Sequence, residues 1–197
     1  DFCCGGSDTL ANAAAEKGLN LAEIETRLTE LQNSKAENPE EYWVNATYPE
    51  IIDHILVRYH QRHREQLQEL IVLADRVESV HGDREDCPIG VAAELRNIYE
   101  DLSNHMMKEE HVLFPMIKAG NYMMAQMPIR MMEMEHSEHG EHLEVLKSLT
   151  NNMTPPADAC NTWRALYSGI QEFADDLMMH IHRENNILFP RVIAENH

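Results

Sequence analysis

The sequence lacks a long apolar run, since no stretch approaches the roughly 18 uninterrupted apolar residues of a membrane span. Nor does it open with a basic region followed by an apolar stretch, so we expect neither a membrane span nor a signal peptide. Basic residues are scarce, because 34 acidic residues stand against 16 basic ones and give a formal net charge of -18. Such a charge repels phosphate backbones and anionic lipid heads, which argues against nucleic acid or membrane partners.

Cysteine is sparse as well, with four in 197 residues. Cys3 and Cys4 are adjacent, and a large helical core needs no disulfide, so we expect a reducing compartment, most simply the cytoplasm. Cys87 and Cys160 lie next to expected helix starts, and a structural role is predicted for both. The chain begins at Asp1 without a methionine, and we expect a longer N-terminal part upstream of it.

Histidine and methionine are abundant instead, at twelve residues each. Neutral imidazole is the commonest protein ligand for transition metals, so the histidines indicate a metal site. Of all residues 43% are hydrophobic, which is ordinary for a globular protein and enough for one sizeable core. We therefore expect one main domain with a small appendage.

The main domain, residues 47–197, is expected to be an antiparallel up-down four-helix bundle, and the fold class is therefore all-α. Long amphipathic segments alternate there with breaker-rich stretches at residues 81–88, 120–128 and 151–156. Short connections of this kind join antiparallel neighbours in helix bundles.

The appendage, residues 1–46, is expected to be the end of a truncated N-terminal helical domain that carries the cysteine pair. One short helix is predicted after Ser7 and Asp8, and another from about Leu19 to Leu31. A polar stretch is expected to follow through Pro39.

An internal repeat relates the second long helix to the fourth. The words HMMKEEHVLFP and HIHRENNILFP align over their whole length, and in both a His-x-x-x-Glu pair interrupts the apolar seam. In the second helix the seam is expected to continue through Val112 and Met116. The first and third helices complete the repeat, because His60 is echoed by His136. Each half is thus a helical hairpin with one histidine on its first helix and a His-x-x-x-Glu pair on its second.

The four repeated histidines are expected to share one layer of the bundle. Counted from the breakers at 1.5 Å per residue, each lies roughly 18 Å from the same end. Residues i and i+4 share a helix face, so both glutamates point inward beside their histidines. A single seam histidine is more often a hydrogen-bonded core residue, but the shared depth, the repeat and the paired glutamates favour metal ligation for the set. The predicted ligands are His60, His105, Glu109, His136, His180 and Glu184.

Four imidazoles and two carboxylates buried in an apolar core require compensating positive charge. A metal pair supplies it, with two histidines per ion, both carboxylates shared, and a water-derived oxygen as a third bridge. Mixed nitrogen and oxygen ligation with open positions in a bundle core suits iron, and manganese less well. Zinc remains an alternative, although it would not exploit a bridged pair.

Other histidines are weighed against the same geometry. His63 and His139 lie a turn further along the seam and either support the ligands or only line the cavity. His81 follows His60 by 21 residues, about 31 Å on a continuous helix, and is excluded. Weaker candidates for tuning the site are Asp101 and Glu135. The histidines expected to be solvated are His54, His111, His142, His182 and His197.

The arrangement resembles the hemerythrin-like di-iron proteins. The word DFCCGG at residues 1–6, with HMMKEEHVLFP and DDLMMHIHRENNILFP, resembles the RIC (repair of iron centres) family of iron-sulfur cluster repair proteins over essentially the whole chain. Hemerythrin itself has His-x-x-x-His on its third helix and His-x-x-x-x-Asp on its fourth. Here Gly140 stands where that second histidine would be, and Glu184 follows His180 by four residues. The departure argues against reversible dioxygen carriage and favours the repair family.

The resemblance implies a bacterial cytoplasmic protein with two iron ions, oxo- or hydroxo-bridged. It implies that the protein restores iron-sulfur clusters damaged by oxidative or nitrosative stress, with the damaged proteins as recipients and nitric oxide or dioxygen as small ligands. Members are often dimeric, so a homodimer is left open. Cys3 and Cys4 are candidate redox thiols in this family's N-terminal domain, or else incidental thiols in a glycine-flanked turn.

Two alternatives to cluster repair stay open, as does the question of whether the chain is an enzyme. One is reduction of nitric oxide at two facing open iron positions. The other is a gas-binding module, for which an attached output domain would be expected. Iron storage would require a cage-forming oligomer, which nothing in the sequence suggests.

Overall fold

A computed structural model describes residues 9–33 and 39–195. By its contacts the chain divides into two compact units, Asp1–Ala46 and Thr47–His197. Within the described ranges the structure contains helices and no strands. No helix among those residues is both long and apolar enough to cross a membrane.

In its described residues, 9–33 and 39–46, the first unit contains three short helices: α1 (Leu10–Glu16), α2 (Leu21–Asn33) and α3 (Pro39–Asn45). The Thr9 side chain caps α1 by accepting a hydrogen bond from the Asn12 backbone N–H at 3.2 Å. The first two helices were predicted, and α3 was missed, since a polar stretch was expected up to its first residue. Cys3 and Cys4 lie outside the described residues.

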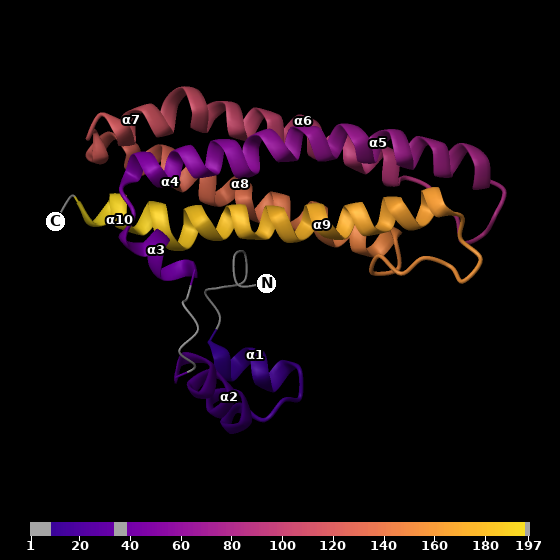
Figure 1. Ribbon diagram of the computed structural model, residues 1–197, viewed down its shortest axis with the longest axis horizontal. Coiled ribbons are helices and arrows are strands. Elements are labelled where there is room, and N and C mark those ends of the chain that lie inside the picture. The colour runs from indigo at the N-terminus through magenta and orange to yellow at the C-terminus, as the bar shows by residue number, and fades with distance from the viewer. Residues whose placement is uncertain (1–8, 34–38, 196–197) are drawn as a thin grey trace. The chain divides into compact units, whose positions relative to one another are not determined.

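The second unit is built from four long helical columns that lie lengthwise beside one another (Figure 1). Three of the columns contain a π-helical segment, labelled η. The first column comprises α4 (Tyr48–His54), η1 (Ile55–His60) and α5 (Gln61–His81). The second comprises α6 (Val91–Lys108), η2 (Glu109–Leu113) and α7 (Phe114–Lys118). The third is α8 (Tyr122–Leu149), and the fourth comprises α9 (Asn161–Arg183), η3 (Glu184–Leu188) and α10 (Phe189–Ala194). The predicted all-α four-helix bundle is confirmed.

Local signals in the sequence set the ends of the columns. Thr47 and Glu50 form a reciprocal capping box that starts α4. Gly90 begins α6 with φ +101°, a left-handed conformation that glycine adopts without strain. The Glu78 carboxylate of α5 then accepts hydrogen bonds from the backbone N–H groups of Gly90 and Ala92, at 3.2 and 2.8 Å, which ties α6 to its antiparallel neighbour.

An apolar core runs along the bundle and surrounds the polar layer. Trp163, Phe173 and Phe189 are fully buried, as is the seam of α6. Full burial of each large apolar side chain contributes about 1.5–3 kcal/mol relative to exposure. Columns one and four approach so closely that a Cβ on Gly169 would lie 2.7 Å from Cδ2 of Leu70. The core therefore holds the four columns at a fixed spacing around the site.

The apolar seam of the second column shifts by one residue after Glu109. Val112 was predicted to face the core and is 44% exposed, whereas Leu113 is buried. Met116 is only partly buried, and Ile117 takes its place in the core. The cause is η2, because a π-helical turn holds one more residue than the α-helical turn on which the expected period was based.

Candidate metal centre

The π-helical segments coincide with the predicted metal ligands. Segment η1 ends at His60, η2 begins at Glu109, and η3 begins at Glu184. The third column has no such segment and carries His136 on a regular α-helix. Single π-turns inside α-helices are frequent at functional sites, since each one redirects side chains locally. Three of the four columns are thus distorted at the layer where the polar side chains meet.

All six predicted ligands converge inside the bundle and are at most 1% exposed. They form two overlapping groups of four whose ligand atoms lie within 4.8 Å of one another. His60 and His180 make one group with both glutamates, and His105 and His136 make the other. Both carboxylates therefore belong to both groups, as shared ligands of two adjacent ions would. That the six residues bind metal stays a prediction.

The histidines turn their Nε2 atoms toward the carboxylates. His60 Nε2 and His105 Nε2 lie 3.3 and 3.4 Å from the same Oε2 atom of Glu109. His136 Nε2 lies 3.1 Å from Oε2 of Glu184, and His180 Nε2 lies 3.1 Å from its Oε1. Each of the two carboxylates is thus contacted by one histidine from each group.

The donor set fits a pair of cations. Within the described part of the chain, both oxygens of Glu109 and Oε2 of Glu184 are buried without a hydrogen bond of good geometry. A buried carboxylate in that condition is costly unless positive charge compensates it. Imidazole nitrogen and carboxylate oxygen together suit transition ions such as iron, so the orphaned atoms have the right chemistry for ligands.

In the protein without metal, protons on the histidines supply part of that positive charge. Burial would lower the pKa of His60, but the adjacent carboxylates of Glu109 and Glu110 outweigh it and raise the pKa to about 9. Burial lowers the pKa of His180. Burial alone would raise the pKa of Glu184, yet the facing histidines His180 and His136 hold it well below its usual range. Metal binding would therefore displace protons from the site.

Three of the four ligand histidines are anchored from outside by a second hydrogen bond. His60 Nδ1 lies 2.8 Å from Oε1 of Glu110, which Arg64 also contacts. His136 Nδ1 lies 2.8 Å from Oδ1 of Asn185. Such outer partners fix the ring orientation and tautomer of a metal-binding histidine.

The third anchored ring is His105, whose Nδ1 lies 2.9 Å from Oε2 of Glu135. Lys108 contacts the other oxygen of the same carboxylate. Glu135 was predicted as a weak candidate for tuning the site, and it contacts a ligand histidine directly. Asp101 does not, because it is exposed and lies 3.2 Å from His142.

Sequence reasoning missed Glu110 and Asn185. A regular helical period turns the residue after an inward glutamate away from the core. In the structure both residues lie in π-helical segments and reach a histidine on another column. The sequence feature that could have identified them is that Glu110 and Asn185 occupy equivalent positions in the two aligned segments.

His63 and His139 are buried beside the site but belong to neither group. The His63 ring lies 5.3 Å from that of His180, and the His139 ring lies 4.9 Å from that of His105. Burial lowers the pKa of both, to about 2 for His139. Which of the two predicted roles these residues fill, supporting the ligands or lining a cavity, stays a prediction.

The remaining histidines divide as follows. His81 belongs to neither group and ends α5, where its Nε2 lies 3.3 Å from the sulfur of exposed Cys160. His111 is exposed as predicted. The prediction that His142 is simply solvated is wrong, because its Nδ1 lies 2.6 Å from the Glu94 carboxylate. His54 and His182 are partly buried, and His197 lies outside the described residues.

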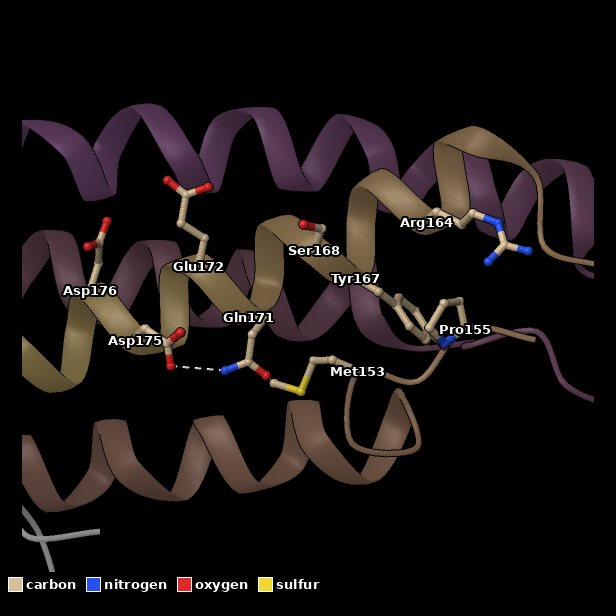
Figure 2. Close-up of a pocket in the computed structure, with 9 residues that line it drawn as sticks. All are labelled: Met153, Pro155, Arg164, Tyr167, Ser168, Gln171, Glu172, Asp175 and Asp176. Atoms are coloured by element: carbon tan, nitrogen blue, oxygen red, sulfur yellow. Dashed lines mark hydrogen bonds between the residues drawn. The ribbon is translucent and has the colours of Figure 1, made fainter. Parts of the chain in front are cut away.

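A surface pocket elsewhere on the bundle contains none of the six ligands (Figure 2). It lies along α9, beside the loop that carries Met153 and Pro155, and its polar lining includes Glu172, Asp175 and Arg164. In the same view the Gln171 side chain donates to Asp175 at 2.9 Å. The six converging side chains are buried among the four columns instead, and none of them lines this pocket.

Comparison with known proteins places this geometry in a family. The model of the Hemerythrin HHE cation binding domain matches residues 51–192, which include all six converging side chains. The chain belongs to the hemerythrin-like RIC family. A Domain of Unknown function (DUF542) matches residues 1–32, which agrees with a separate N-terminal unit.

Relatives of this family match nearly the whole chain. A "Probable iron-sulfur cluster repair protein" of Haemophilus influenzae is 69% identical over 195 residues, covering 99% of this chain and 87% of the relative. The "Iron-sulfur cluster repair protein YtfE" of Musicola paradisiaca is 57% identical, covering 98% and 86%. The protein of the same name in Escherichia coli is also 57% identical, covering 98% and 87%. The family predicted from the DFCCGG and His-x-x-x-Glu motifs is confirmed.

Proposed function

We propose that the chain holds two iron ions between its four columns and restores damaged iron-sulfur clusters in other proteins. The observation that carries the two-iron site is the overlap of two four-residue groups through Glu109 and Glu184. Cluster repair is supported by the printed names of relatives that are 56–69% identical. The free thiols of Cys87 and Cys160 suit a reducing compartment such as the cytoplasm.

The protein's own residues determine how iron would be held. Glu109 and Glu184 would be ligands common to both ions, and each ion would take two histidine Nε2 atoms. Nδ1 of the anchored histidines would donate to Glu110, Glu135 and Asn185, which keeps Nε2 deprotonated and aimed inward. Bound iron would supply redox chemistry and a source of iron for a damaged cluster. Burial of all six ligands excludes bulk water from the ions.

Repair can be tested directly with an enzyme whose cluster has been destroyed by nitric oxide. We expect the iron-loaded protein to restore its activity, and the Glu109→Leu variant to restore far less. Equimolar free ferrous iron is the essential control, because it alone reconstitutes some clusters. Recovery no greater than with free iron would contradict the proposed function.

Reduction of nitric oxide is the second candidate, because two ions that share both carboxylates would lie side by side. Anaerobic turnover with an electron donor, followed by detection of nitrous oxide, distinguishes the two. Catalytic nitrous oxide formation without recovery of the damaged enzyme would favour the second candidate over repair.

A further inference from the structure

The two halves of the bundle supply equivalent ligands, and one pair of outer partners is equivalent too. Glu110 follows Glu109, and Asn185 follows Glu184, at the same place in the repeat. Each lies 2.8 Å from Nδ1 of a histidine on the preceding column of its own hairpin. The rings of His60 and His136 are therefore anchored at the same atom, His60 by a carboxylate oxygen and His136 by an amide oxygen.

The other pair of outer positions breaks this symmetry. Glu135 immediately precedes His136, and it lies 2.9 Å from Nδ1 of His105. The equivalent residue before His60 is Tyr59, whose ring stacks on that of His180 with centroids 5.3 Å apart and an interplanar angle of 11°. Stacking presents a ring face and no acceptor. Within the described residues, the buried Nδ1 of His180 has no hydrogen-bond partner.

The missing hydrogen bond belongs to only one of the two metal positions. We call the group of His60 and His180 position 1, and the group of His105 and His136 position 2. Both histidines of position 2 have an Nδ1 partner, whereas at position 1 only His60 has one. Loss of such an outer partner typically costs about 10- to 100-fold in metal affinity.

Burial and the shared carboxylates do not distinguish the two positions. All four rings are at most 1% exposed, so neither position is more open to water. Both positions share Glu109 and Glu184, so the carboxylates contribute to both. What distinguishes the two positions is therefore the hydrogen bond that fixes the ring of His105 and that His180 lacks.

We propose that position 1 binds iron more weakly than position 2 and releases its iron first. The proposal rests on the two-iron site proposed above and deepens it, because it names the ion that is available for delivery to a damaged cluster. His180 is the ligand through which the weaker binding acts, and Tyr59 and Glu135 are the positioning residues that make the two positions unequal.

The test uses the full chain loaded anaerobically with Fe²⁺ and equilibrated with increasing EDTA. We expect iron to leave in two steps whose EDTA concentrations differ by about 10- to 100-fold. Anomalous diffraction at the iron edge, on crystals of half-depleted protein, should show the remaining ion beside His105 and His136. Equal residual occupancy, or an ion remaining beside His60 and His180, would overturn the proposal.

The number and place of the irons in fully loaded protein also show whether this inference or the two-iron site has failed. If fully loaded protein holds a single iron at position 2, the ranking of positions stands and the two-iron site fails. A single iron at position 1 contradicts both.

Variants of Glu135 and Tyr59 test the cause. Glu135→Leu removes the acceptor for His105 and should bring the two EDTA steps together, while Glu135→Gln keeps an acceptor and should restore their separation. Tyr59→Phe keeps the stacked ring and serves as the matched control, with the separation unchanged. Asn185→Ala removes the anchor of His136 and tests the same idea should Glu135→Leu fail to fold. Two results would refute the hydrogen bonds to Nδ1 as the cause of the difference. One is that the two EDTA steps merge in Tyr59→Phe, and the other is that their separation stays unchanged in both Glu135→Leu and Asn185→Ala.

Discussion

The Nε2 atoms of His105 and His136 face each other 3.1 Å apart at the centre of the bundle. Two neutral imidazoles can share such a contact only when one of them carries the proton at Nε2. Their Nδ1 atoms, however, face the oxygens of Glu135 and Asn185, which favours the proton on Nδ1 of both rings. Both Nε2 lone pairs then point to one place, as ligands of a single cation would.

Glu109→Leu and His180→Leu should therefore lose metal. Glu109 belongs to both groups, so its loss should impair both positions, whereas His180→Leu should impair position 1 first. Metal analysis with Mössbauer spectroscopy should find two coupled irons per chain in the parent. Glu138→Leu makes the same change on an exposed residue of α8 and should keep both irons. A single zinc in the parent would overturn the assignment of iron.

Removal of the metal should lower thermal stability. A ligand present at 1,000 times its dissociation constant stabilises the folded state by about 4 kcal/mol. For a chain of this size, each kcal/mol shifts the unfolding temperature by about 2–4 °C. Chelated protein should thus unfold roughly 8–16 °C below the iron-loaded protein, by calorimetry. The same chelator should leave the unfolding temperature of Glu109→Leu unchanged, and a shift there would point to another metal site.

The sequence predicted the six side chains that converge because helix depth and the repeat depend only on residue counting and on breakers. It did not predict the π-helical segments, which show no periodic signal of their own. That omission explains why Val112 was assigned to the core in place of Leu113. It also explains why Glu110 was not expected to reach His60, a contact between columns that no spacing within one helix reveals.

Asp176 should be important for stability although it binds no metal in this proposal. Asp176 is 8% exposed, and its carboxylate accepts from Arg58 at 2.5 Å and from Gln66 at 3.0 Å. Asp176→Ala leaves the Gln66 amide buried without that acceptor, at a cost of about 1–3 kcal/mol in the free energy of unfolding. Urea denaturation would measure it.

The matched control for this variant is the neighbouring Asp175, which is exposed and lines the surface pocket of Figure 2. Asp175→Ala should change the free energy of unfolding by no more than about 0.5 kcal/mol. Equal effects of the two substitutions would show that the buried hydrogen bonds of Asp176 contribute nothing.

Arg84 should make stability depend on pH where the loop after α5 meets the loop before α9. Its guanidinium contacts Asp86 at 2.8 Å and Asp158 at 3.0 Å, which joins the loop after α5 to the loop before α9. The hydrogen bonds from Arg84 lower the pKa of both carboxyl groups below 3.8. Because the lowered pKa values belong to the folded state, this stabilisation is complete above the unfolded pKa and is lost as pH falls through the folded values.

Arg84→Gln should accordingly unfold at a lower temperature than the parent at pH 7, and the difference should shrink as the pH falls below 3.8 and vanish below the lowered folded pKa values. Both carboxylates are exposed, so the difference should be small and should shrink in high salt. Thermal melts of metal-free protein between pH 2.5 and 7 measure it. A difference that grows on acidification would contradict the assigned sign.

Cys160 and Cys87 should differ sharply in reactivity toward thiol reagents. Cys160 is exposed at the start of α9, where its sulfur lies 3.3 Å from Nε2 of His81. Cys87 is buried, and burial raises its pKa, so less of it is thiolate at neutral pH. Brief treatment with N-ethylmaleimide followed by peptide mass spectrometry should find Cys160 modified well before Cys87. In His81→Phe, which keeps a ring but no nitrogen, Cys160 should react more slowly at pH 7. Faster labelling of Cys87 in the folded protein would contradict the burial that the structure gives it.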